Sequence, residues 1–136
     1  QTAGRGRRGR VWNDGAGNLM ASVLVRSEGA TQQLSFVAAL ALHEALGSLT
    51  APAGEGRFAL KWPNDVLLDG IKCSGILLER QGDALVIGIG ANLAGHPQGT
   101  ERPATSLAAA GLPVPAPVQL LHELMPAFAA LRQLWE

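Results

Sequence analysis

The first residues of the chain combine two residue types that suit the binding of an anion. Between Gly4 and Arg10 the sequence reads GRGRRGR, so four arginines alternate with three glycines, and Trp12 follows. Arginine carries a permanent charge and a planar fork of donors that matches carboxylate or phosphate oxygens. Glycine lets backbone N–H groups approach a ligand with no Cβ in the way. The run predicts an anion-binding loop, although composition alone is equally compatible with a frayed basic terminus.

The same run contains the pattern GxGxxG between Gly4 and Gly9. In a dinucleotide-binding fold this pattern follows a strand and opens a helix. Here no strand precedes the glycines, and turn-forming residues follow Trp12. The context excludes the dinucleotide interpretation.

Lys61 and Lys72 are the only lysines of the chain. Lys61 stands at the end of an expected strand, directly before Trp-Pro-Asn-Asp, where its ammonium could stabilise negative charge on a phosphate or acyl oxygen. Periodicity alone favours the simpler interpretation, which is a solvated lysine at a sheet edge.

Four other polar residues have simple local interpretations. Asn64 and Asp65 fit an Asx turn, and Asn92 after two glycines fits the same description. Cys73 is most simply a small buried apolar residue. No histidines and cysteines have metal-ligand spacing, and no Ser/His/Asp arrangement suggests nucleophilic catalysis.

Composition predicts one folded domain of 136 residues, with 47% hydrophobic and 16% charged residues. The formal net charge is zero, so no overall field attracts nucleic acid or an anionic membrane. A single cysteine favours a reducing compartment, and neither a leader nor a long apolar run is present. We therefore expect a cytoplasmic protein with no nucleic-acid or membrane partner.

Apolar periodicity and turn signals predict an α+β fold, with a mixed, largely antiparallel sheet and helices packed on one face. Thr31 is expected to cap the first helix, and Pro126 to kink or restart the second. Asp69-Gly70 predicts a hairpin turn, and Gln81-Gly82-Asp83 a second one. The expected strands are 19–25, 58–61, 66–68, 71–79 and 84–89, and the expected helices are 31–49 and 117 or 118 onward.

Four motifs in this order and spacing resemble the catalytic domain of biotin–protein ligases, the biotin–[acetyl-CoA-carboxylase] ligases. The match extends from Gln1 to about Gly111, and Gly17-Asn18-Leu19 and Thr105-Ser106-Leu107 resemble weaker positions of that family. The motifs are GRGRRGR (4–10) with Trp12, KWPND (61–65), KCSGIL (72–77) with Glu79, and GIGANL (88–93).

The resemblance implies ATP-dependent ligation of biotin to a lysine of a biotin carboxyl carrier protein domain, through biotinyl-5′-AMP. Biotin and ATP would be substrates, with Mg²⁺ near Asn92, and Lys61 and Arg7 would be catalytic. The implied biotin-binding residues are Gln1, Gly4, Arg5, Gly6, Arg7, Lys61, Gly75, Gly88 and Gly90. The implied ATP- and adenylate-binding residues are Arg5, Arg7, Arg8, Arg10, Trp12, Lys61, Asn64 and Asn92.

The chain departs from the family pattern at both ends. It lacks the strands that precede the Gly/Arg loop and the C-terminal β-barrel, and it has no DNA-binding domain, so we expect residues 1–136 to be a catalytic domain truncated at both ends. Two alternatives stay open: a lipoate or octanoate ligase or transferase of the same fold, and a truncated biotin-binding domain without activity. A homodimer is a further expectation.

Overall fold

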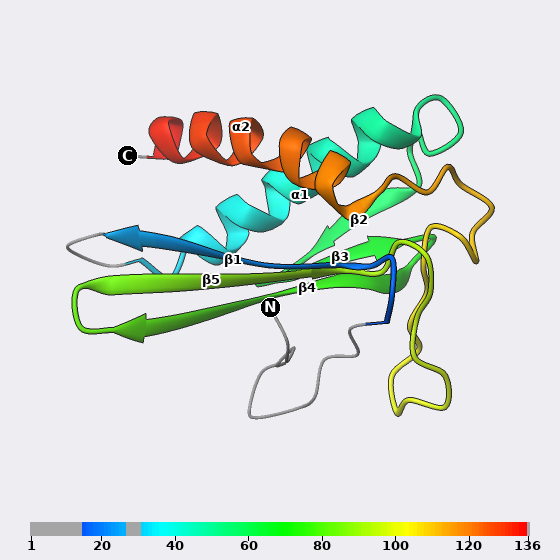
Figure 1. Ribbon diagram of the computed structural model, residues 1–136, viewed down its shortest axis with the longest axis horizontal. Coiled ribbons are helices and arrows are strands. Elements are labelled where there is room, and N and C mark those ends of the chain that lie inside the picture. The colour runs from blue at the N-terminus through cyan, green and yellow to red at the C-terminus, as the bar shows by residue number, and fades with distance from the viewer. Residues whose placement is uncertain (1–14, 27–30, 136) are drawn as a thin grey trace.

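The computed structural model describes residues 15–26 and 31–135, and the structural statements below refer to these residues. They form one sheet with strand order β1-β5-β4-β3-β2, and helices α1 and α2 cover one of its faces (Figure 1). The elements are β1 (Leu19–Arg26), α1 (Leu34–Thr50), β2 (Phe58–Lys61), β3 (Asp65–Leu68), β4 (Ile71–Gln81), β5 (Ala84–Ala91) and α2 (Pro117–Trp135).

The pairings of these strands are all antiparallel, and an isolated bridge between Lys72 and Ala104 is parallel. This architecture confirms the predicted α+β class with a largely antiparallel sheet. Among the described residues, neither helix combines the length and the apolar character that crossing a membrane requires.

Alternation along β5 explains why the helices cover a single face. Leu85, Ile87 and Ile89 are buried with the apolar stripe of α1, whereas Gly88 and Gly90 fall on the opposite face. Successive side chains of a strand point to opposite faces, so this pattern fixes which side faces the core. We call the side away from the helices the open face.

Helix α1 begins three residues later than the expected cap at Thr31, and that cap prediction was wrong. The Thr31 hydroxyl accepts a hydrogen bond from Arg80 Nη2 at 2.8 Å, and the Thr31 carbonyl accepts one from Leu34 N at 3.0 Å. The N-cap residue is Gln33, which makes no side-chain capping bond. The hydroxyl therefore ties the start of α1 to β4 instead of capping the helix.

Helix α2 runs without interruption through Pro126, so the predicted restart does not occur. Proline removes the hydrogen bond to the carbonyl four residues earlier. That carbonyl belongs to His122, and both residues are exposed, so water can satisfy the freed oxygen.

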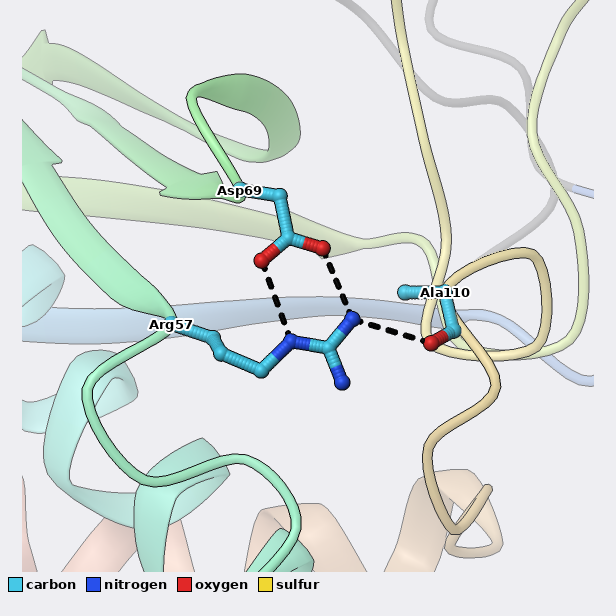
Figure 2. A network of polar contacts seen from close by, with 3 residues as sticks. All are labelled: Arg57, Asp69 and Ala110. Atoms are coloured by element: carbon cyan, nitrogen blue, oxygen red, sulfur yellow. Dashed lines mark hydrogen bonds and ion pairs between the residues drawn. The ribbon is translucent and has the colours of Figure 1, made fainter.

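The predicted Asp-Gly hairpin turn joins β3 to β4. Asp69 has φ 53° and Gly70 has φ 80°, the left-handed conformations that this short turn requires. The Arg57 guanidinium holds the turn, donating from Nε to Asp69 Oδ1 at 3.0 Å and from Nη2 to Asp69 Oδ2 at 2.7 Å (Figure 2). Nη2 also donates to the carbonyl of Ala110 at 3.0 Å, so one side chain joins the hairpin to a distant loop.

The hydrogen bond from Arg57 lowers the pKa of Asp69. A lowered folded-state pKa means that the carboxylate stabilises the fold above its unfolded pKa, about 3.9, and that this contribution disappears as the pH falls through the folded value. We expect Asp69→Asn, which keeps the turn conformation, to lower the melting temperature slightly at neutral pH, by an amount that shrinks as the pH falls below about 4. Thermal melts of both proteins across this range measure the difference, and a constant difference at all pH values would contradict the prediction.

Candidate functional site

The Gly/Arg loop lies outside the described residues. The predictions for Gln1, Gly4, Arg5, Gly6, Arg7, Arg8, Arg10 and Trp12 therefore stay predictions from sequence. The site described below consists of the remaining candidates, Lys61, Asn64, Gly75, Gly88, Gly90 and Asn92.

Strand register brings residues from all five strands into one row across the open face. Lys61 pairs with Asp65, Asp65 with Gly75, Gly75 with Gly90, and Gly90 with Met20. Directly opposed residues of antiparallel strands project from the same face. The row therefore places Lys61 and Asp65 beside Gly75 and Gly90. Because these glycines have no side chains, the surface of the sheet lies closer to its backbone at these two positions. Gly75 is half-buried and Gly90 is buried, and neither places a side chain between the β4–β5 backbone and a ligand on this face.

Gly88 belongs to the neighbouring row, where it pairs with Leu77 of β4 and Ser22 of β1. A Cβ built on Gly88 would meet the Leu77 carbonyl oxygen at 3.6 Å and the Leu77 Cβ at 3.8 Å, which are ordinary contacts. Packing among the described residues therefore does not require glycine here. The absent side chain instead extends the low surface of the open face.

Asn64 fixes the turn that follows Lys61. Its side-chain amide donates to the Ile76 carbonyl at 2.7 Å, and its own carbonyl accepts from Ile76 N at 3.0 Å. These bonds extend the β3–β4 ladder by one residue, so Asn64 makes a cross-strand contact where an Asx turn was expected. The neighbouring Trp62 is 67% exposed and lies against Phe36 of α1, with ring centroids 5.3 Å apart.

Asn92 follows β5 and is 2% exposed. Its backbone N–H donates to the Cys73 carbonyl at 2.8 Å, and its side-chain amide donates to the Thr105 carbonyl at 3.1 Å. The Asn92 Oδ1 atom is buried, with no hydrogen-bond partner in the described part of the chain. Asn92 therefore anchors the segment around Thr105 and keeps one buried oxygen available as an acceptor.

Asn18 has a supporting role that the sequence suggested only weakly. Its Oδ1 accepts hydrogen bonds from the N–H groups of Leu93, Ala94 and Gly95 at 2.9, 2.9 and 3.2 Å. Its Nδ2 donates to the Gly95 carbonyl at 2.9 Å. The side chain therefore binds the loop after Asn92 to the start of β1. Turn composition predicted a polar residue here, but its partner lies 77 positions away, so no local pattern identifies it.

His43, to which the sequence gave no role, links α1 to the strand that ends in Lys61. Its Nε2 lies 3.1 Å from the Phe58 carbonyl, and its ring meets the Phe58 ring edge-on with centroids 6.5 Å apart. The contact helps to place β2 against the helix layer. It is structural, and it does not bring His43 to the open face.

Cys73 is buried, as its sequence context predicted, and its thiol donates to the Val66 carbonyl at 3.5 Å. Burial raises the pKa of this thiol to about 12. A thiolate is the reactive form, so the folded chain holds the sulfur in an unreactive state. Over residues 15–26 and 31–135, no group of three or more His, Cys, Asp or Glu side chains could hold a metal ion.

We expect iodoacetamide at pH 8 to leave Cys73 unmodified in the folded chain and to alkylate it after unfolding in guanidinium chloride. Intact-mass spectrometry measures one carbamidomethyl group per chain, since the sequence has a single cysteine. Rapid labelling without denaturant would show that β4 opens locally or that the thiol is exposed.

The family of the chain follows from a comparison with known proteins. The model of the biotin/lipoate A/B protein ligase family matches residues 1–92, and the chain belongs to this family. The matched residues include β1 to β5 and Asn92, and so the whole row that contains Lys61.

Curated relatives specify the similarity further. The chain is 48% identical over 143 residues to the biotin–[acetyl-CoA-carboxylase] ligase of Paracoccus denitrificans, covering 95% of this chain and 58% of that protein. It is 42% identical over 122 residues to the ligase of the same name from Mycobacterium tuberculosis, covering 85% of this chain and 45% of that protein. The chain thus spans about half of the length of these relatives.

Solved structures show the same fold with ligands bound. The biotin protein ligase of Leishmania major in complex with biotinyl-5-AMP superposes with a TM-score of 0.82 at 33% identity, covering 98% of this chain and 62% of that one. The biotin protein ligase of Aquifex aeolicus in complex with biotin and ATP superposes with a TM-score of 0.82 at 32% identity, covering 98% of this chain and 57% of that one. These similarities confirm the predicted resemblance to biotin–protein ligases.

Proposed function

We propose that the chain catalyses the ATP-dependent ligation of biotin to a lysine of a biotin carboxyl carrier protein, through biotinyl-5′-AMP. The observation that carries this proposal is the row on the open face, where Lys61 stands beside Gly75 and Gly90. A low surface next to a cation suits a ligand that lies flat on the sheet and presents an anionic group at one end. The biotin, ATP and biotinyl-5-AMP complexes of the relatives support the same assignment.

The chemistry consists of two displacements. A carboxylate oxygen of biotin attacks the α-phosphorus of ATP, the bond to the β-phosphate oxygen breaks, and pyrophosphate leaves. The carrier lysine then attacks the acyl carbon, and AMP leaves with the electrons of the cleaved acyl–oxygen bond. In both steps negative charge builds on oxygens near the phosphorus or the acyl carbon, and a positioned cation lowers the barrier.

We assign that cation to Lys61. Its strand ends in the turn that Asn64 fixes, so the backbone beneath the ammonium is held in place. Arg7 and Arg5 of the Gly/Arg loop are proposed to neutralise the carboxylate and phosphates, and Trp12 to pack beside the adenine. Gly88 and the two glycines of the row are proposed to lie beneath biotin.

Mg²⁺ fits this chain as an ion delivered with the nucleotide. Mg²⁺ in phosphoryl-transfer sites is commonly held by phosphate oxygens, waters and one or two protein oxygens. The buried Oδ1 of Asn92 is an oxygen ligand of this kind without another partner in the described part of the chain, where no acidic cluster offers a complete cage. When bound, the ion would neutralise charge on the leaving pyrophosphate.

The carrier partner proposed here is the biotin carboxyl carrier domain of acetyl-CoA carboxylase, as the names of the relatives indicate. A cytoplasmic location and a homodimer remain predictions from the sequence analysis. The same holds for the domain boundaries, with residues 1–136 as the catalytic domain.

Biotin-dependent exchange of labelled pyrophosphate into ATP tests the proposed function directly. We expect exchange by this chain with Mg²⁺, and a loss of at least about 100-fold in Lys61→Ala, because removal of a donor to developing charge costs roughly 10²–10³ in rate. Arg26→Ala, at the far end of β1, is the matched control and retains activity. Exchange with lipoate or octanoate in place of biotin would favour the alternative ligase. Biotin binding without pyrophosphate exchange would favour the other alternative, a truncated biotin-binding domain without activity.

Gly88→Ala tests the low surface separately from the lysine. We expect the biotin KM to rise by roughly tenfold while stability changes by less than about 0.5 kcal/mol, because a Cβ at this position makes only ordinary contacts within the sheet.

The control for this substitution is Gly54→Ala. A Cβ at Gly54 would collide with the Thr50 hydroxyl and lie 3.2 Å from the Phe58 ring, so it should cost about 1–3 kcal/mol in stability without changing the biotin KM. Titration of exchange against biotin gives the KM, and urea unfolding gives the stability. An unchanged KM in Gly88→Ala would place biotin elsewhere on the open face.

A further inference from the structure

Residues 105–112 form a compact turn next to the candidate site, which we call the anchor turn. Within it, Ala110 N donates a hydrogen bond to the Ser106 carbonyl at 3.1 Å. Leu112 N donates to the Leu107 carbonyl at 3.0 Å, and both of these leucine side chains are buried. Because these bonds make the anchor turn a single unit, a movement at one of its ends is transmitted to the other.

Asn92 of the candidate site holds the first end of the anchor turn. Its Nδ2 donates to the Thr105 carbonyl at 3.1 Å, and its own carbonyl accepts from Leu107 N at 3.2 Å. A carbonyl oxygen can only accept, so the Asn92 amide must present its NH₂ group to Thr105 and direct Oδ1 elsewhere. The position of Thr105 therefore sets the direction of the buried Oδ1 atom, which has no hydrogen-bond partner within the described ranges.

Arg57 holds the other end of the anchor turn. Its Nη2 donates to the Ala110 carbonyl at 3.0 Å, while Nε and Nη2 both donate to the Asp69 carboxylate (Figure 2). The two bonds to the carboxylate fix the plane of the guanidinium, and so they aim the N–H that reaches Ala110. The Arg57 side chain is 32% exposed and that of Asp69 46%, so the ion pair alone adds little stability. Its distinctive effect is to connect the β3–β4 hairpin to the anchor turn.

The buried Leu107 side chain fixes the middle of the anchor turn, which leaves a pivot about that point as its easiest movement. Arg57 opposes the pivot because it holds the far end. Without Arg57, the pivot would lengthen the bond between Asn92 and Thr105 and let the amide rotate. Thr105 N is also bonded to the Lys72 carbonyl at 2.9 Å, so the expected movement is a small rotation and the anchor turn stays attached to the sheet.

We propose that Arg57 is a positioning residue for Asn92, acting through the anchor turn, and that it thereby holds the buried Oδ1 in place for the nucleotide and its Mg²⁺. The proposal rests on the proposed function for what Oδ1 binds. It assigns the two bonds to Asp69 to orienting Arg57, and the bond to Ala110 to holding the anchor turn. An ion pair that only stabilised the hairpin would leave nucleotide binding unchanged.

Arg57→Met tests this role, because it keeps an unbranched side chain and removes every N–H donor. We expect the KM for MgATP in biotin-dependent pyrophosphate exchange to rise about fivefold, the effect that one hydrogen bond usually has on an equilibrium. We expect the KM for biotin and kcat to stay unchanged, because the row that contains Lys61 is not touched. Titration of exchange against each substrate separates the two KM values.

Asp69→Asn is the matched control, since it removes the charge of the same ion pair and leaves the bond from Arg57 to Ala110. The amide oxygen of the new side chain can still accept from Arg57 and keep the guanidinium in place. We expect a slightly lower melting temperature and an unchanged KM for MgATP. An unchanged KM for MgATP in Arg57→Met, or an equal rise in Asp69→Asn, would overturn the proposal. Melting temperatures of both variants identify any loss that comes from unfolding.

Amide hydrogen exchange, followed by NMR without substrates, tests the contact independently of activity. The reporters are Thr105 N–H and Leu107 N–H, which are bonded to carbonyls at the sheet, and the internal control is Ile76 N–H, which is bonded to the Asn64 carbonyl. We expect Arg57→Met to speed hydrogen exchange several-fold at both reporters and not at Ile76, because only the anchor turn opens more often. Unchanged exchange at the reporters would refute the proposal. A wild-type chain without pyrophosphate exchange would refute the proposed function, while amide exchange still decides whether Arg57 holds the anchor turn.

Discussion

The pairing register of β4 is the constraint on which both the core and the candidate site depend. β4 lies between β3 and β5, and its residues alternate between the helix face and the open face. A slip of one residue would exchange the two sets, turning Ile76 to the open face and Gly75 toward the helices. Burial of the apolar set against α1 opposes such a slip, because each large apolar side chain moved into water would cost about 1.5–3 kcal/mol. The hydrophobic core thereby also determines where the glycines of the site lie.

The bulge at Cys73 lets β4 satisfy two partners with different registers. Toward β5 the pairing is regular from Ser74 to Gln81, whereas toward β3 it shifts between Val66 and Leu67. The extra residue remains compatible with a packed core because Cys73 is small, apolar and buried. Its thiol and the neighbouring carbonyls find partners within the fold, so the irregularity leaves these groups satisfied. Bulges next to functional sites commonly re-aim a side chain, and here the re-aimed side chain is Lys72.

Local sequence signals, namely apolar periodicity and turn residues, made most of the fold predictable. Asp69-Gly70 and Gln81-Gly82-Asp83 predicted the turns of the two hairpins, and the structure confirms both. The pairing of β1 with β5 has no local signal, because about 60 residues separate them. The cap at Thr31 was predicted wrongly because its hydroxyl has a tertiary partner that no local pattern shows.

The candidate site, like the fold, was predictable from the sequence only in part. The KWPND and GIGANL motifs identified Lys61, Asn64 and Asn92, and their resemblance to a family supplied a role for each. Sequence spacing could not show that Asn64 also bonds the Ile76 carbonyl across the sheet, because that partner depends on strand register. It could not show that Asn92 bonds the Thr105 carbonyl either, because that partner depends on the path of the loop after β5. The ion pair between Lys72 Nζ and Asp65 Oδ1, at 3.2 Å, was also hidden, because simple alternation along β4 places Lys72 on the helix face and the register shift toward β3 is not visible in the sequence.

The two faces of the sheet have different roles: the helix face stabilises the fold, and the open face carries the candidate site. The helix face buries the large apolar side chains, so it supplies most of the favourable free energy of folding. The open face holds the exposed Lys61 and, beside it, the glycines Gly75, Gly88 and Gly90, which bury no large side chain and so add little to stability. An exposed ammonium is well solvated, and its attraction for an anion is weak in water. That attraction strengthens when a ligand and the segments that cover it displace the water, so the exposure of Lys61 is compatible with a catalytic role.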